Sequence, residues 1–360
     1  METLSESLFY AALRQVIDPD LGKDIVTAGM VRGLSWNAET QLVALTVQLT
    51  TPACPLKGYF TERIQAAIRA HVGENWRVEV QFTAPSLARG ADTLPQIGAI
   101  ILIGSGKGGV GKSTVAVNLA VALNRLGARV GLLDADIYGP SVPILLGLEQ
   151  AKPTVQEKDG RPYLVPLSKF GLEVMSIGFL VPAGQPTPWR GPMASNTLRQ
   201  LLTETLWPEL DYLIVDMPPG TGDIHLTLAQ QFRPQGVVIV TTPQKVALAD
   251  AEKALRMFQM PLVQVPILGV IENMAYFWTS QLPTQKFYIF GQQGGHRLAQ
   301  KYNVPFLGEI PLMEEVVSRS DAGVPVALEE GMPMAEAFLN VAGMLVRSLA
   351  RHKHNLVAAS

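Results

Sequence analysis

The chain has 360 residues, of which 48% are hydrophobic, and its 29 basic residues nearly balance its 31 acidic ones. This composition predicts a globular protein of two domains, and a formal net charge of -2 gives no reason to expect nucleic acid or a membrane surface as a partner. The first ten residues lack the basic region of a secretory signal, and no uncharged apolar run approaches the roughly 18 residues of a membrane span. We therefore expect a cytoplasmic protein.

Residues 1–82 show the pattern of a small α+β domain. A helical stretch and strand-like runs alternate there, at residues 4–16, 30–36, 42–49 and 76–82, with a second helix after Pro55. Residues 83–96 contain two prolines and a glycine without periodicity, which is typical of a linker.

Residues 97–360 predict an α/β domain with a three-layer, mostly parallel sheet. Continuous apolar runs recur between helical patterns, at residues 100–103, 130–133, 174–177, 212–215, 237–240, 267–271 and 304–307. Such runs are expected when helices cover both faces of a parallel sheet. Ligands of these sheets bind beyond the carboxyl ends of the strands, so the residues after each run are the candidates for a site.

The single cysteine, Cys54, excludes an intrachain disulfide, and a thiolate metal site would need ligands from another chain or molecule. It lies in a Thr-Pro-Ala-Cys-Pro segment before a predicted helix, whose N-terminus would lower the thiol pKa. A semi-buried thiol that binds no metal explains the same residue.

The first strand of the large domain leads into a nine-residue phosphate-binding loop, G-K-G-G-V-G-K-S-T. Its backbone N–H groups would surround a phosphate chain, Lys112 would reach the outer phosphates, and the Ser113 hydroxyl would bind Mg²⁺. The predicted nucleotide contacts are Gly106, Lys107, Gly108, Gly109, Val110, Gly111, Lys112, Ser113 and Thr114. Lys107 is a surplus charge for an ordinary loop of this type.

Carboxylates follow two further strands. Asp134 and Asp136 end the second strand, where one could orient magnesium-bound water and the other an attacking water, although one of them could instead cap the next helix. Asp216 ends the fourth strand as the expected magnesium partner, and Gly220 could donate its N–H to the terminal phosphate. The segment 217–223 has two prolines and two glycines, which favours a loop that moves with phosphate occupancy. His225 is interpreted as a structural hydrogen-bond partner.

Asn273 ends the sixth strand, and its amide could read the edge of adenine. No N-K-x-D pattern for guanine occurs, which favours ATP over GTP.

These motifs resemble the deviant-Walker P-loop ATPases, which include MinD, ParA and the nitrogenase iron protein and carry an extra lysine at the position of Lys107. More narrowly, residues 134–141, 189–193, 216–223 and 271–274 resemble the Mrp/ApbC family of iron-sulfur cluster carriers. In residues 1–82, Asp18-Pro19, Asp24-Ile-Val26, Gly29 and the segment Thr50–Pro55 resemble the iron-sulfur assembly domain that precedes the ATPase in bacterial members.

The resemblance implies a homodimer that binds ATP and Mg²⁺, hydrolyses ATP slowly, and transfers a 4Fe-4S cluster to apo-protein clients or receives it from an assembly scaffold. Lys107 would cross to the phosphates of the partner subunit, and Lys112 would serve its own site. Asp136 would position water, and Ser113, Asp134 and Asp216 would organise Mg²⁺.

The chain departs from this family after Met274. Many members carry a C-x-x-C pair there, and two pairs meet across the dimer to bind one cluster. Residues 275–290 contain neither cysteine nor histidine, so Cys54 is the remaining candidate cluster ligand. Two alternatives to a cluster carrier stay open: a MinD/ParA-like switch, for which the basic tail 346–354 could be an anchor, and an ATP-gated client-binding protein without a stable cluster.

Overall fold

The computed structural model describes residues 5–84, 94–180 and 191–359. The chain divides into two compact units, residues 1–86 and 87–360. The division falls inside the segment 83–96 that was predicted as a linker, and most of that segment lies outside the described residues.

The first unit packs two helices with a three-stranded sheet, in which β3 and β4 are antiparallel and β4 and β5 are parallel. Its elements are α1 (Glu6–Leu13), β1 (Ile17–Asp18), β2 (Lys23–Asp24), β3 (Val31–Asn37), β4 (Leu42–Gln48), α2 (Lys57–His71) and β5 (Arg77–Thr83). Buried and partly buried residues alternate along β4, because one face of the strand packs on the helices. Phe9 of α1, Ile64 of α2 and Val47 of β4 belong to the resulting core.

The second unit contains an eight-stranded sheet in the order β10-β11-β7-β12-β6-β13-β14-β15. Its strands are β6 (Ile97–Gly104), β7 (Val130–Asp134), β10 (Leu167–Lys169), β11 (Leu172–Ser176), β12 (Leu210–Asp216), β13 (Gly236–Thr241), β14 (Ile267–Phe277) and β15 (Phe306–Leu312). All neighbouring strands are parallel except β10 and β11. The predicted mostly parallel sheet is confirmed.

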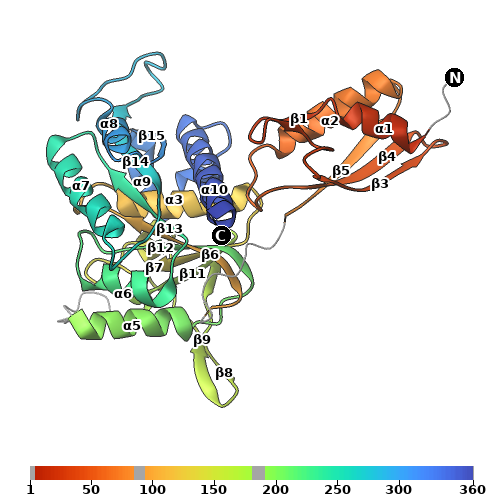
Figure 1. Cartoon of the computed structure of the whole chain (residues 1–360). Coiled ribbons are helices and arrows are strands. Elements are labelled where there is room, and N and C mark those ends of the chain that lie inside the picture. The colour runs from red at the N-terminus through yellow and green to blue at the C-terminus, as the bar shows by residue number, and fades with distance from the viewer. Residues whose placement is uncertain (1–4, 85–93, 181–190, 360) are drawn as a thin grey trace. The chain divides into compact units, whose positions relative to one another are not determined.

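Helices cover both faces of this sheet, which explains why every residue of β6, β12 and β13 is buried. Figure 1 shows α3 and α10 together on one side of the sheet and α5 and α6 on the other. The helices are α3 (Lys112–Arg125), α4 (Val142–Leu145), α5 (Gly191–Thr203), α6 (Asp223–Phe232), α7 (Lys245–Gln259), α8 (Gly294–Lys301), α9 (Glu314–Asp321) and α10 (Pro333–Ala359), with 3-10 turns at Ile177–Phe179 and Val326–Leu328.

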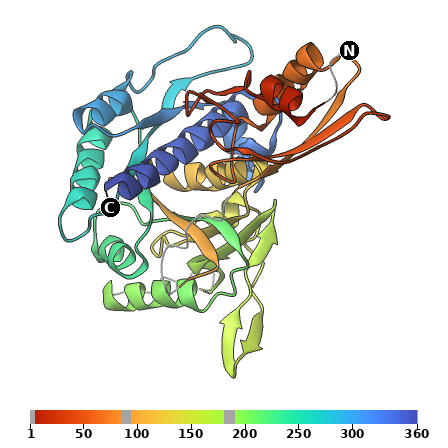
Figure 2. The same ribbon diagram turned by 45° about the vertical axis from the view of Figure 1, so that its right-hand side comes forward.

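Several elements differ from the sequence-based expectation, among them three in the second unit. The last strand, β15, begins at Phe306 instead of residue 304. The edge strand β10 and the hairpin β8 (Val155–Lys158) and β9 (Arg161–Leu164) were not predicted, because their short runs are polar or half-exposed. The hairpin extends away from the sheet in both views (Figures 1 and 2).

The start of the tail segment 346–354 packs into the second unit. It belongs to α10, in which Val346 and Leu349 are buried, and this helix packs on α3, β14 and β15. These apolar side chains contribute to the core and do not form a free membrane-binding face. Among the described residues, no helix is long and apolar enough to cross a membrane.

Candidate functional site

A cavity of about 340 Å³ lies at the carboxyl ends of β6, β7 and β12. Register brings these ends together, because Asp216 is the partner of both Ile103 and Asp134 in adjacent strands. The cavity is lined by Ser105, Lys107, Gly108, Gly109, Gly111, Lys112, Ser113, Thr114, Asp136, Ser141, Leu145 and Pro219. Eight of the predicted site residues are therefore brought to one place, between loop and strand ends.

The glycines of the loop allow its backbone to curl closely around this cavity. Gly109 and Gly111 adopt φ angles of 80° and 78°, which disfavour a side chain. A Cβ on Gly111 would also overlap the amide of Asn273, and one on Gly106 would overlap the backbone of Asp250 in α7. Gly106 thus permits close packing of α7 and does not itself line the cavity. Lys112 begins α3, so the cavity lies at a helix N-terminus, which favours anions.

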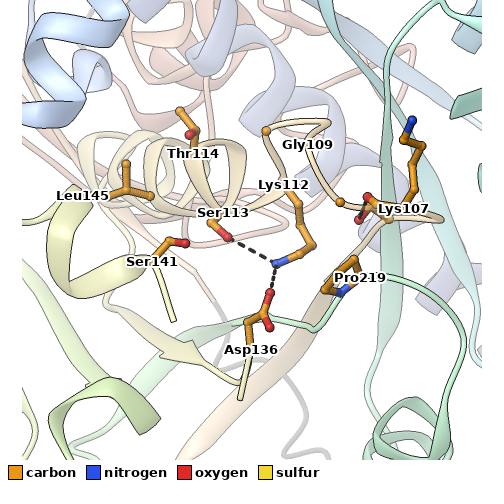
Figure 3. A pocket seen from close by; sticks show the side chains of 12 residues that line it. Lys107, Gly109, Lys112, Ser113, Thr114, Asp136, Ser141, Leu145 and Pro219 are labelled. Carbon is orange, nitrogen blue, oxygen red and sulfur yellow. Dashed lines mark hydrogen bonds and ion pairs between the residues drawn. The ribbon is translucent and has the colours of Figure 1, made fainter. Parts of the chain in front are cut away.

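Lys112 is the central cation of the site, and its side chain is only 6% exposed. Its Nζ donates to Asp216 Oδ1 at 2.7 Å and to the Ser113 hydroxyl at 3.3 Å, and it lies 3.6 Å from Asp136 Oδ2. Figure 3 shows Ser113, Lys112 and Asp136 pointing toward one another inside the cavity. The predicted phosphate-binding lysine is thus held by carboxylates, next to the hydroxyl that was assigned to Mg²⁺.

Asp134 is fully buried and does not line the cavity. Its Oδ1 accepts the N–H of Asp136, and its Oδ2 accepts the N–H of Val142 and the hydroxyl of Ser176. Burial and the nearby Asp216 carboxylate raise the pKa of Asp134 to about 8. Asp134 therefore orders the backbone that carries Asp136. By accepting the N–H of Val142 it also caps α4, and it lies behind the site rather than in the cavity.

Asp136 and Asp216 each retain a buried carboxylate oxygen that accepts no hydrogen bond within the described part of the chain, Oδ1 and Oδ2 respectively. Burial raises the pKa of both groups, and the charge of Lys112 opposes this rise. A buried carboxylate oxygen without a donor is costly, so these atoms are suited to a metal ion or to water held by one.

Lys107 lines the cavity but differs from Lys112 in its surroundings. Its side chain extends away from Lys112 and Asp136 (Figure 3). The ion pairs and side-chain hydrogen bonds found in residues 5–84, 94–180 and 191–359 do not include its amine. The structure thus places at the cavity a second cation, for which the described residues supply no counter-charge.

Two predicted nucleotide contacts make other interactions. The N–H of Gly220 donates to Ser105 O at 2.9 Å, so it can meet a phosphate only if this hydrogen bond breaks. The amide of Asn273 donates to Val110 O at 2.8 Å and is 6% exposed. In this conformation Asn273 supports the phosphate-binding loop from behind, and it does not line the cavity.

Sequence reasoning missed four residues that line the cavity and one that supports it. The lining residues are Ser105, Ser141, Leu145 and Pro219. Ser105, Ser141 and Pro219 stand inside or beside the motifs already recognised, so proximity to those motifs could have found them. Ser176 could not be found, because only sheet register brings the end of β11 next to Asp134.

Cys54 does not have the environment expected from its sequence. It is 8% exposed in the apolar core of the first unit, and burial raises the pKa of its thiol, although an N–H from Leu56 opposes this rise. The predicted lowered pKa is wrong, because α2 begins only at Lys57 and desolvation outweighs its N-terminus. In the described residues, no group of three or more His, Cys, Asp or Glu side chains could hold a metal ion.

Residues 275–290, here called the aromatic segment, follow Met274, where the family resemblance led us to expect a C-x-x-C pair. Phe277, at the end of β14, pairs with Phe287 through two backbone hydrogen bonds of 2.8 and 3.1 Å. Lys286 Nζ lies 4.0 Å from the ring centroid of Tyr276. The large exposed side chains of the segment are Leu282, Phe287, Tyr288 and Ile289.

Part of one motif cannot be placed. Trp189 and Arg190, which contributed to the family resemblance, lie outside the described residues.

The chain is similar to known proteins along most of its length. Residues 96–346 match the ParA family described as NUBPL iron-transfer P-loop NTPase, and residues 9–82 match the iron-sulfur cluster assembly protein family. The iron-sulfur cluster carrier protein of Synechocystis sp. is 45% identical over 331 residues, which cover 91% of this chain and 92% of the relative. The carrier protein of Deinococcus radiodurans is 46% identical over 340 residues, which cover 94% and 92%.

A solved structure extends this similarity to three dimensions. The nucleotide-binding protein of Archaeoglobus fulgidus in complex with ADP is 41% identical, with a TM-score of 0.58 and coverage of 69% of this chain and 94% of that one. The sequence motifs, the P-loop cavity and these matches all indicate the same family. The chain belongs to the ParA family of iron-transfer P-loop NTPases and carries an iron-sulfur cluster assembly domain ahead of the NTPase domain.

Proposed function

We propose that this protein is an ATP-hydrolysing iron-sulfur cluster assembly factor that acts as a homodimer. The observation that carries the proposal is the cavity itself, in which a P-loop and a helix N-terminus surround a buried lysine that touches two carboxylates. A triphosphate would replace the carboxylates as the partner of Lys112, and the loop N–H groups would hold its oxygens. The absence of a guanine-reading motif favours ATP.

Mg²⁺ fits the donors present beside Lys112. The Ser113 hydroxyl and the orphaned Asp216 oxygen would hold the ion, and Asp134 would act indirectly by ordering the strand end. Bound there, Mg²⁺ would neutralise charge on the phosphate oxygens. The orphaned Asp136 oxygen is free to accept a hydrogen bond from the attacking water and so orient it.

The proposed dimer would use the surface around the mouth of the cavity. Lys107 extends away from its own carboxylates and is available to the phosphates of a partner subunit. Two large apolar side chains within two residues of lining residues are exposed, Tyr138 by 66% and Ile144 by 50%. An exposed apolar group beside a charged site is suited to burial in a protein interface.

A Lys107→Ala variant tests hydrolysis and the dimer together. Cationic fingers supplied across an interface contribute on the order of 10³ to 10⁵ in rate, so turnover should fall by about this factor while nucleotide binding persists through Lys112. Lys158→Ala, on the exposed hairpin, is the matched control. Mixing Lys107→Ala with an Asp136→Asn variant should restore part of the activity, because one hybrid site is complete. Loss of turnover without such complementation would contradict the crossed arrangement.

The iron-sulfur cargo does not fit the protein's own thiols. The aromatic segment lacks cysteine, and Cys54 is buried with its proton retained. We therefore propose that thiolates of a client, a scaffold protein or glutathione complete any cluster site. The names of the relatives support iron-sulfur assembly as the process, and they do not provide the missing ligands.

Anaerobic reconstitution with iron and sulfide tests this proposal. The wild type and Cys54→Ser should bind the same small amount of iron without glutathione, and both should gain a cluster spectrum and transfer it to an apo-protein when glutathione is present. Lower iron binding by Cys54→Ser would restore Cys54 as a ligand. Failure to transfer a cluster under either condition would exclude carriage.

One observation favours a second candidate, an ATP-gated protein-binding switch without a cluster. The aromatic segment presents Leu282, Phe287, Tyr288 and Ile289 to solvent, a surface that resembles a protein contact more than a metal site. A client that binds in an ATP-dependent manner without iron transfer would favour this second function.

A further inference from the structure

His225 has a hydrogen-bond arrangement that the proposed roles above do not use. It lies on α6, is 2% exposed, and places both ring nitrogens against backbone carbonyls of the preceding loop. Its Nδ1 is 3.2 Å from Gly222 O and its Nε2 is 3.1 Å from Pro218 O. A carbonyl can only accept, whereas a neutral imidazole has a single N–H, so a neutral His225 can donate to only one of them.

The two carbonyls differ in how much they need this donor. Gly222 O already accepts the backbone N–H of His225 at 3.0 Å. Pro218 is buried, and within the described residues Nε2 is the donor that reaches its carbonyl. Because a buried carbonyl without a donor is costly, the neutral ring should carry its proton on Nε2 and hold Pro218.

Pro218 is one fixed point of the loop that separates β12 from α6. Next to it, Pro219 lines the nucleotide cavity, and Gly220 has a φ of 96° with no atoms within 4 Å of a Cβ position. The Gly220 N–H donates to Ser105 O and would have to leave it to reach a phosphate. Holding Pro218 therefore restricts movement to residues 219–222 and keeps Pro219 at the cavity.

We propose that His225 is a positioning residue that fastens the phosphate-sensing loop 217–222 through an N–H donated from Nε2 to Pro218 O, and that protonation fastens it further by adding a second donor to Gly222 O. Its importance for turnover rests on the ATPase activity proposed above, but its effect on the loop does not.

The surroundings of the ring determine when the second hydrogen bond forms. Burial lowers the pKa of His225 below its ordinary value of 6.5, the two carbonyls oppose this change, and the charge of Lys112 from α3 adds to it. From α7, Phe258 packs at 6.3 Å between ring centroids and carries no charge. The second donor is thus present only at a pH below about 6.5, and the loop should tighten as the pH falls through the lowered pKa.

Nitrogen NMR of the full chain labelled with ¹⁵N-histidine tests the proton position directly. The chain has five histidines, so the His225 signals are assigned by their loss in His225→Gln. Near pH 7.5 the expected spectrum is that of a neutral ring protonated on Nε2, changing to the cationic pattern below pH 6.5. A proton on Nδ1 near pH 7.5 would overturn the proposal.

Hydrogen exchange of the loop amides supplies a second measurement that needs no activity. His225→Gln keeps a donor near the Nε2 position but cannot protonate, whereas His225→Leu removes both donors. In His225→Leu the protection factors of the loop amides, those of Met217, Gly220, Thr221 and Gly222, should fall on the order of tenfold, the size of one net hydrogen bond. His225→Gln should match the wild type near pH 7.5 and lack its added protection in acid. Equal protection in all three proteins would contradict the proposal that His225 fastens the loop.

Turnover completes the test. If ATP hydrolysis is confirmed, His225→Leu should lower kcat several-fold with little change in KM, and His225→Gln should recover it. If the wild type does not hydrolyse ATP, the proposed function fails, while the NMR and exchange results still decide whether His225 fastens the loop. If kcat is unchanged in a His225→Leu protein whose loop exchanges faster, the hydrogen bond of His225 only stabilises the loop. That result would overturn its positioning role.

Discussion

The P-loop cavity and the aromatic segment lie at or after the carboxyl ends of strands in the same sheet, but the first contains buried charged side chains and the second exposed apolar ones. The cavity gathers charged side chains that are almost inaccessible, such as Lys112 and Asp136, whereas the segment after β14 presents Leu282 and Ile289 to solvent. The cavity contains buried carboxylate oxygens that lack a donor among the described residues and are suited to a charged ligand. The segment contains exposed apolar side chains that are suited to burial against another apolar surface.

This contrast separates two parts of the function. Nucleotide binding can be assigned from the cavity, because a buried lysine, carboxylates and loop glycines occur together for few other purposes. An iron-sulfur cargo cannot be assigned in the same way, since the segment in which the family resemblance predicts a C-x-x-C pair contains aromatic residues and no cysteine here.

The largest effect on stability and nucleotide affinity is expected from Lys112→Ala, which removes the buried cation of the cavity. Breaking a buried ion pair leaves Asp216 and Asp136 uncompensated, so the free energy of unfolding should fall by about 3–5 kcal/mol, and nucleotide affinity should fall by about 100-fold or more. Thermal unfolding and titration with a labelled nucleotide measure these changes. The double variant Lys112→Ala with Asp216→Asn should recover stability but not affinity; recovery of affinity would show that the lysine acts only as a structural counter-ion.

A smaller but still large effect is expected from Gly111→Ala. The φ of 78° and the amide of Asn273 both oppose a side chain, so strain of about 1–3 kcal/mol should distort the loop and weaken nucleotide binding by about tenfold or more. Gly139→Ala is the matched control, because Gly139 has no atoms within 4 Å of a Cβ position and no positive φ. Equal affinities in the two variants would mean that the loop tolerates strain at Gly111.

The Cys54 thiol should react slowly with alkylating reagents, and its contribution to stability should fall at high pH. Burial raises the pKa of its thiol above the ordinary value of 9.0, so the folded state retains the proton more tightly than the unfolded chain. Its stabilising contribution is fully present below that value and is lost as the pH rises through the folded pKa. At about pH 8, iodoacetamide should react with Cys54 of the folded protein at least about ten times more slowly than with the protein unfolded in guanidinium. Comparable rates would place the thiol at the surface.

The smallest effect on stability is expected in the aromatic segment. Tyr288→Ser and Ile289→Ser alter exposed side chains, so each should change the free energy of unfolding by about 0.5 kcal/mol or less. Binding of a client or a second subunit should weaken if the segment is a contact surface. Ala275→Ser, at a buried position of the same segment, should show the reverse pattern of lower stability and unchanged binding; a large stability loss in the exposed variants would make the segment part of the core.

The elements predicted from sequence differ in accuracy for physical reasons. The buried strands β6, β7, β12 and β13 were found because continuous apolar runs have few other interpretations in an α/β pattern. The hairpin β8–β9 and the edge strand β10 were missed, since exposed short strands lack that pattern.

The same distinction applies within the site. Lys112, Ser113 and Asp136 were predicted to be together and are, because a contiguous motif and strand-end carboxylates carry their own spacing. Asn273 was assigned to the ligand from its amide and its place at a strand end, and Gly220 from its N–H in the loop after Asp216. Packing gives both of them backbone partners instead. Cys54 was misjudged because a helix N-terminus is visible in sequence and desolvation is not.

The sequence by itself determined the fold class, the phosphate-binding loop and the absence of a C-x-x-C pair, because each of these depends on local pattern or on residue identity. Only the tertiary structure decided how the polar groups are satisfied: Ser176 reaches Asp134, Asp216 reaches Lys112, and His225 reaches Pro218. These contacts depend on strand register and on burial. Both properties arise when distant segments meet, and they set the hydrogen bonds and the charges that the site can use.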